Sequence, residues 1–157
     1  MKLFKIICSI SYFLLLGYGV FFAPRRRGHH YNYEINFFPL KNSIHGLFTL
    51  DLHNKKEVYN FYLNLIGNII LFIPFPMVLI MVGKIDKFKV IILLAFLFST
   101  SIEIVQYLFQ IGLADIDDVI LNTTGALIGF FIYKKLEQSK FLLYKGKDQD
   151  IKCRFFL

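Results

Sequence analysis

Long runs of uncharged, mostly apolar residues constrain this chain more than any other feature of its sequence. Two runs, residues 6–24 (19 residues) and 58–83 (26 residues), match the length of about 20 apolar residues that a bilayer-crossing helix needs. A third crossing over residues 90–114 is possible once Glu103 is accepted inside it, and residues 119–133 supply a fourth. The chain of 157 residues is therefore predicted to be a polytopic membrane protein.

The composition of the chain supports a membrane protein and argues against a soluble nucleic-acid-binding protein. Hydrophobic residues make up 56% of the chain, against roughly 45 to 50% in soluble domains. A net charge of +7 would suggest nucleic acid as the partner of a soluble chain, but in a membrane protein it reflects topology. We therefore expect the lipid bilayer as the partner and no nucleic acid.

We predict an all-α integral membrane protein, a bundle of about four transmembrane helices with a long non-cytoplasmic first loop. The helices are expected over residues 3–23, 59–82, 89–113 and 117–133. The corresponding regions are a first membrane helix (1–23), an extracytoplasmic interfacial loop (24–58), a three-helix membrane core (59–133) and a cytoplasmic basic tail (134–157). The loop is expected to lack regular structure up to a helix start capped by Asn54. The fourth helix is expected to be short, since its 15 uncharged residues rise only about 22 Å.

The placement of lysine and arginine predicts the orientation. Four spans put twelve of the 18 basic residues on the side of both termini and six on the other side. The positive-inside rule therefore favours a multi-pass protein of the cell membrane with both termini in the cytoplasm, although three consecutive arginines, residues 25–27, lie on the opposite side.

Polar side chains recur at helical spacing in the second, third and fourth spans. A spacing of three or four residues puts side chains on one face of a helix. In the second and third spans these faces comprise Asn60, Asn64, Asn68 and Ser99, Glu103, Gln106, Gln110. The fourth span begins with Asp115, Asp117 and Asp118, and Asn122 follows one turn later. We expect these groups to converge in one half of the membrane, because the helix ends that carry them share a side.

This convergence predicts a polar cavity that opens beside the acidic loop. Counting 1.5 Å per residue inward from the non-cytoplasmic side puts Glu103 about 17 Å deep, at the cavity floor near the bilayer midplane. An acid there is expected to be neutral, as a hydrogen-bond donor or a proton donor. The candidate catalytic residues are Glu103, Asp115 and Asp118; the candidate substrate-binding residues are Asn64, Asn68, Gln106, Asp117 and Asn122. In the alternative interpretation the amides only hold helices together.

The sequence gives weaker indications of metal binding and of helix packing than of the polar site. The four histidines, His29, His30, His45 and His53, lie on the same side as the aspartates, but their spacing fits no standard metal motif, so no cofactor is identified. Gly125 and Gly129 form a GxxxG pattern, which favours close packing within the bundle over dimerisation, and the oligomeric state is left open.

Four stretches of the sequence resemble the VanZ-like family, which is named after a teicoplanin-resistance protein. They are INFFP (residues 35–39), NLIGNIILFIP (64–74), SIEIVQ (101–106) and DIDDVILNTTGALIGF (115–130). The resemblance covers roughly residues 36–133 and includes the order and spacing of these stretches. It implies an integral membrane protein associated with lowered sensitivity to teicoplanin-type glycopeptides.

Three functional hypotheses fit this pattern. The first is a membrane enzyme that modifies a lipid-linked cell-envelope intermediate such as a peptidoglycan precursor, with the aspartates as base or metal ligands and Glu103 as acid. The second is a non-catalytic binding protein for a lipid-linked precursor or for a lipoglycopeptide. The third is a small proton-coupled transporter or flippase subunit, for which an intramembrane carboxylate is the usual clue.

Overall fold

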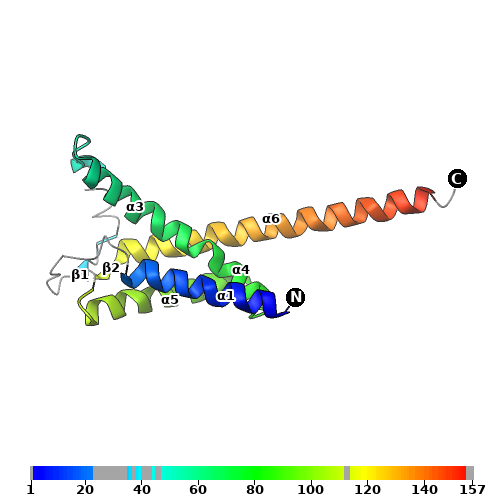
Figure 1. Ribbon diagram of the computed structural model, residues 1–157, viewed down its shortest axis with the longest axis horizontal. Helices are drawn as coiled ribbons and strands as arrows, with labels where there is room; N and C mark the ends of the chain where they lie inside the picture. Colours follow the sequence, from blue (N-terminus) through cyan, green and yellow to red (C-terminus); the bar gives the residue numbers. More distant parts are fainter. Residues whose placement is uncertain are drawn as a thin grey trace.

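Four helices in the structure are long and apolar enough to cross a membrane. The computed structural model describes residues 2–22, 35–36, 38–39, 44, 47–111 and 114–154. Within them the candidate spans are Leu3–Phe21, Lys55–Met81, Phe88–Leu108 and Ile116–Ser139. The spans confirm the predicted all-α membrane bundle, and Figure 1 shows their arrangement.

The first span combines two kinds of helix. Helix α1 (Lys2–Gly17) continues directly into a π-helical segment, η1 (Tyr18–Phe22). Most of its side chains face outward, as expected for a helix at the lipid boundary, but Leu16 and Val20 are buried against the rest of the bundle. The predicted helix over residues 3–23 is confirmed within one or two residues at each end.

The second span is interrupted, where the sequence predicted one helix over residues 59–82. Helix α3 (Lys55–Phe72) begins four residues earlier, and the side chain of Asn54 caps it by accepting a hydrogen bond from the Glu57 N–H, as predicted. The chain breaks at Ile73, and helix α4 (Pro74–Met81) follows. Proline lacks the N–H that an α-helix needs, so the break follows from the proline that begins α4.

The third span is shorter than predicted. Helix α5 (Phe88–Leu108) ends five residues before the expected residue 113. Gln110 has a positive φ of 55°, the Gln110 N–H donates to the carbonyl of Tyr107 at 3.2 Å, and the Ile111 N–H donates to that of Gln106 at 3.0 Å. These are the two hydrogen bonds of a Schellman motif, which ends the helix although glutamine takes the place of the usual glycine.

The fourth helix is the opposite case, because it is much longer than predicted. Helix α6 (Ile116–Arg154) has 39 residues and extends far beyond the other helices towards the C-terminus (Figure 1). It continues past Tyr133 through residues with high helix propensity, where Lys134 and Glu137 form an exposed ion pair at 2.9 Å. The expectation of a short fourth span is therefore wrong, and most of the predicted basic tail, up to Arg154, is helical.

Helix α6 packs against α3, α4 and α5. A Cβ atom on Gly125 would overlap the carbonyl oxygen of Ile69, and one on Gly129 would overlap that of Ile73. The GxxxG pattern therefore serves packing within the chain, as predicted, and it brings the α6 backbone directly against the break between α3 and α4. The apolar core of the bundle is a cluster of buried side chains from several helices: Leu16, Val20, Phe72, Phe75, Ala95, Ile102 and Ala126.

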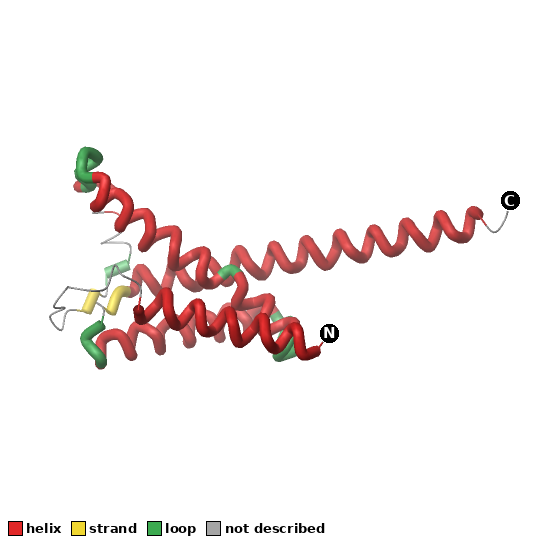
Figure 2. The backbone as a smooth tube through the Cα atoms, in the orientation of Figure 1, coloured by secondary structure: helices red, strands yellow, loops and turns green. Residues whose placement is uncertain are grey.

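A pair of very short strands joins two distant connections of the chain. Strand β1 (Ile35–Asn36) pairs in parallel with strand β2 (Ala114–Asp115), with Ile35 opposite Ala114 and Asn36 opposite Asp115. Figure 2 shows both strands beside the start of α6. The sequence predicted no regular structure near residues 35–36, so this pairing is a correction. It ties the first connection to the acidic loop.

Candidate functional site at the loop end of the bundle

One end of the bundle holds most of the predicted polar residues. We call it the loop end, because it contains the C-terminal ends of η1 and α5, the N-terminal ends of α3 and α6, and both strands (Figure 2). The buried polar side chains among the described residues are Asn68, Ser99, Glu103, Gln106, Asp117, Asp118 and Asn122. All except Ser99 were predicted as site residues.

The acidic loop is organised by its own first carboxylate. Asp115 accepts a hydrogen bond from the Asp117 N–H at 3.0 Å, so it caps the start of α6. Asp117 and Asp118 lie in the first helical turn, where the helix dipole favours negative charge. This arrangement gives the aspartates a structural role in addition to any chemical one.

Glu103 meets this loop near the C-terminal end of its helix. Its carboxylate accepts a hydrogen bond from the Asp115 N–H at 3.1 Å, and its side chain is only 5% exposed. Because α5 ends at Leu108, Glu103 lies five residues, or about 8 Å, from the end of its helix. This distance is shorter than the predicted depth of about 17 Å, because that count assumed a helix up to residue 113. The position of Glu103 relative to the bilayer midplane stays a prediction.

Two further hydrogen bonds join α6 to its neighbours at this end. The Asn64 amide on α3 donates to the Asp118 carboxylate at 3.5 Å, the outer limit of such a contact. One turn further along α6, the Asn122 amide donates to the Ser99 hydroxyl of α5 at 2.8 Å, and both side chains are buried. The polar faces of α3, α5 and α6 therefore do converge, and they join through direct contacts between side chains.

Gln106 links α5 to the first span. Its amide N–H donates to the carbonyl of Val20 at 3.0 Å, inside the π-helical segment η1. The sequence held no signal for this partner, because a π-helix cannot be recognised from residue types alone. The Gln106 carbonyl oxygen and the Asn68 amide nitrogen are both buried, and neither has a hydrogen-bond partner among the described residues. Such atoms are uncommon in folded proteins and mark places where water or a ligand can bind.

The residue types that could bind a metal, histidine and aspartate, do not form a metal site in the part of the chain that the structure describes. There, no group of three or more His, Cys, Asp or Glu side chains is arranged to hold a metal ion. Three of the histidines, His29, His30 and His45, lie outside the described residues, so the hypothesis of a site shared with the aspartates is untested for them.

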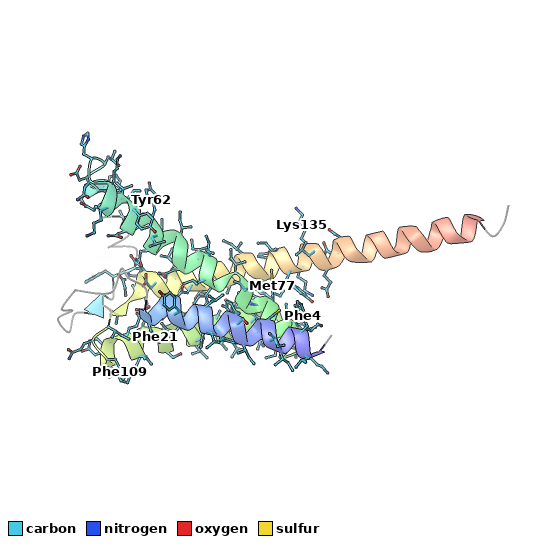
Figure 3. The ribbon with its side chains drawn as sticks, in the orientation of Figure 1. Phe4, Phe21, Tyr62, Met77, Phe109 and Lys135 are labelled. Carbon is cyan, nitrogen blue, oxygen red and sulfur yellow. The ribbon has the colours of Figure 1, made fainter. Side chains whose placement is uncertain are left out.

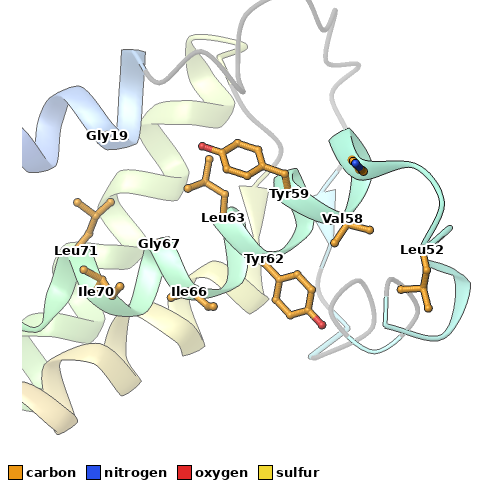
Figure 4. Close-up of a pocket in the computed structure, with 11 residues that line it drawn as sticks. Gly19, Leu52, Val58, Tyr59, Tyr62, Leu63, Ile66, Gly67, Ile70 and Leu71 are labelled. Carbon is orange, nitrogen blue, oxygen red and sulfur yellow. The ribbon is translucent and has the colours of Figure 1, made fainter.

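The structure also has a groove that the sequence did not predict. It has a volume of about 830 Å³ and lies along the outer side of α3, between this helix and η1 (Figure 4). Its lining residues are Gly19, Leu52, Lys55, Val58, Tyr59, Tyr62, Leu63, Ile66, Gly67, Ile70 and Leu71. The predicted polar site residues do not line it, so the groove and the buried polar groups are separate features of the loop end.

Comparisons with known proteins agree with the resemblance seen in the sequence. The model of a family described as VanZ/LLP1 matches residues 9–141. A curated relative, protein VanZ from Enterococcus faecium, is 38% identical over 84 residues, which cover 48% of this chain and 50% of the relative. The chain thus spans about half the length of that relative. No solved structure matches the chain significantly.

Proposed function

The chain belongs to the VanZ/LLP1 family, and we propose that it lowers the sensitivity of a bacterial cell to teicoplanin-type glycopeptides. In this proposal it acts on cell-envelope chemistry from the outer half of the cytoplasmic membrane. The resistance role is what the family resemblance implies. The orientation follows from the twelve basic residues on the side of the termini against six on the other.

The observation that carries the proposal is the meeting of the family-like stretches at the loop end. Asn64 of the second stretch contacts Asp118 of the fourth, although 54 positions separate them. Glu103 of the third stretch contacts Asp115 at the start of the fourth. Ionisable groups are costly within a membrane protein and are usually retained for function. Several of them gathered at one end therefore favour an active site or a binding site there.

In the enzymatic form of the proposal, Glu103, Asp115 and Asp118 carry the chemistry. Glu103 accepts a hydrogen bond from a backbone N–H while Asp118 accepts one from a side-chain amide, so the two carboxyl groups differ in at least one hydrogen-bond donor. Different surroundings are what an acid and a base require when they divide their roles. Asn68 and Gln106, each with a buried polar atom that has no hydrogen-bond partner in the part of the chain that the structure describes, would bind polar groups of the substrate.

The second candidate function is non-catalytic binding of a lipid-linked precursor or of the lipid tail of the antibiotic. The apolar groove along α3 favours this binding function, since the groove has a volume of about 830 Å³. Ligand pockets typically measure about 300 to 1,000 Å³. A proton-coupled transporter would differ from both in losing its effect when the proton gradient is dissipated.

A resistance assay tests the proposal. The chain is expressed in a bacterial host without a family member, and growth inhibition by teicoplanin is measured together with the amount of protein in the membrane. We expect the inhibitory concentration to rise with the wild-type chain. Asp115→Asn and Asp118→Asn should abolish that rise at unchanged protein amount.

Asp86→Asn serves as the matched control, because Asp86 is exposed in the connection between α4 and α5, at the opposite end of the bundle. Full resistance with both loop-end variants would show that the functional site does not depend on these two carboxylates. No rise with the wild-type chain would refute the resistance role itself. Dependence of the effect on divalent metal would separate the enzyme from the binding protein.

A further inference from the structure

The turn that precedes α3 carries large apolar side chains that the rest of the protein leaves uncovered. Leu47, Phe48 and Leu52 are all exposed, and Phe48, at 83%, is the most exposed large apolar side chain among the described residues. We call residues 47–52 the apolar turn. Exposed apolar patches of this kind mark contact surfaces for a membrane or for another protein. The apolar turn therefore needs a partner outside the bundle.

The apolar turn lies at the level of the membrane surface. Helix α5 has 21 residues, or about 31 Å at 1.5 Å per residue, which matches a hydrocarbon core of about 30 Å. The end of α5 therefore marks the boundary between the hydrocarbon and the head groups. Figure 1 shows α3 starting level with the end of α5 along the long axis of the molecule. The turn directly before α3 lies at the same boundary.

The apolar turn also lies to the side of the other helices. Figure 1 shows α3 diverging from α1 and α5 towards its N-terminal end. Tyr59 and Tyr62, in the outer half of α3, are exposed, and Figure 3 shows Tyr62 on the outer side of this helix. Leu52 continues the same surface, since it lines the groove along α3 together with both tyrosines (Figure 4). The apolar turn is thus continuous with a surface that faces lipid.

The charges around the apolar turn balance each other. Lys55 and Lys56 follow the turn, whereas Asp51 lies within it and Glu57 comes directly after the lysines, and all four residues are exposed. An anionic partner held by charge would require an excess of lysine. The lysines can instead extend to lipid phosphates while their stems stay on apolar surface. The turn therefore suits the interface of a bilayer, including a bilayer of zwitterionic lipid.

We propose that the apolar turn is a membrane anchor, in which Leu47, Phe48 and Leu52 insert between the lipid head groups and the upper acyl chains at the loop end. The anchor holds the start of α3 away from the bundle, and it keeps the groove along α3 open to the bilayer. This inference goes beyond the proposed function, because it assigns a lipid contact that is the same in either orientation of the protein.

Tryptophan fluorescence tests the anchor, because the chain contains no tryptophan. Phe48→Trp replaces one aromatic ring by another in the turn. Leu97→Trp supplies a reference on the exposed side of α5, 11 residues before its end at Leu108, or about 17 Å into the bundle. The full chain is reconstituted in phosphatidylcholine vesicles that carry bromine, which quenches nearby tryptophan, either close to the head group or deep in the acyl chain. We expect Phe48→Trp to be quenched more strongly by the shallow bromine and Leu97→Trp by the deep bromine.

Further variants of Phe48→Trp show whether apolar side chains hold the turn in the bilayer. Leu47→Ser combined with Leu52→Ser should reduce the quenching by the shallow bromine, because two of the three inserted side chains are then lost. Asp51→Ser is the matched control in the same turn and should leave the quenching unchanged, since it removes no apolar side chain. Addition of phosphatidylglycerol should also leave it unchanged, because the charges balance.

Three results would overturn the anchor. Unquenched emission at the wavelength of tryptophan in water would place Phe48→Trp in solvent. Unquenched emission at a shorter wavelength would show that a second copy or another protein segment covers the turn. Quenching that requires phosphatidylglycerol would replace the apolar contact by a charged one. The resistance assay is independent of all three, so the proposed function and the anchor can fail separately.

Discussion

The carboxylate of Glu103 on α5 accepts a hydrogen bond from the backbone N–H of Asp115, 12 residues further along the chain. This contact fastens the start of α6 to the side of α5, across the turn that ends α5. It also helps to explain why an acid can be kept within a predicted span, because a main-chain N–H at the loop end donates to the carboxylate. Glu103 therefore positions the acidic loop whatever else it does.

Substitution of Glu103 separates this positioning role from proton transfer. Glu103→Gln retains a carbonyl oxygen that can accept the Asp115 N–H, so we expect normal protein amount in the membrane. We also expect loss of teicoplanin resistance, because an amide cannot exchange a proton. Glu103→Leu should lower the free energy of unfolding by about 1 to 3 kcal/mol, since it removes the buried acceptor of the Asp115 N–H hydrogen bond. Full resistance of the glutamine variant would exclude proton transfer by Glu103 and favour the non-catalytic binding function.

The close approach of α6 to the second span predicts a strong effect of small substitutions. Gly125→Ala and Gly129→Ala each place a Cβ atom on a backbone carbonyl of the second span, so the helices must move apart. We expect a loss of about 1 to 3 kcal/mol in stability for each, measured by thermal unfolding in detergent. Gly17→Ala is the control, because its Cβ would meet nothing within 4 Å. Equal melting temperatures for all three variants would contradict the packing described.

The buried pair of Asn122 and Ser99 predicts coupling between α6 and α5. Asn122→Leu, Ser99→Ala and the double variant form a cycle, and we expect a coupling energy of about 0.6 to 2 kcal/mol, as for hydrogen bonds between membrane helices. The free energy of unfolding is measured for the purified wild-type protein and for each of the three variants. Asn64 and Asp118, at 3.5 Å, should couple more weakly. Strict additivity of the first pair would show that their contact contributes nothing to stability.

The orientation is predicted to have both termini in the cytoplasm. After Cys8→Ser and Cys153→Ser, a single cysteine is introduced by His53→Cys, before α3, or by Lys145→Cys, in the last third of α6. A membrane-impermeant thiol reagent added to intact cells should label only the first. Permeabilised cells provide the control, where both should react. Labelling of Lys145→Cys alone in intact cells would reverse the topology and the side on which the loop end lies.

Sequence reasoning located the four spans because transfer into a bilayer is nearly additive along the chain. Each apolar run predicts its own helix without knowledge of the others, and the Asn54 cap is equally local. The convergence of polar faces was also predictable, since it depends on helical spacing and on which ends share a side. Asn64, Asn122 and Asp118 were found in this way.

The tertiary structure decided what depends on distant partners or on backbone conformation. The end of α5 follows from the positive φ of Gln110, which residue type does not predict, and it puts Glu103 closer to the end of its helix, beside the acidic loop. The pairing of β1 with β2 and the Gln106 contact to Val20 join segments more than 70 residues apart. The groove depends on the angle between two spans. Local transfer energies therefore determined which segments are helices, whereas packing between distant segments decided where the helices end and what they enclose.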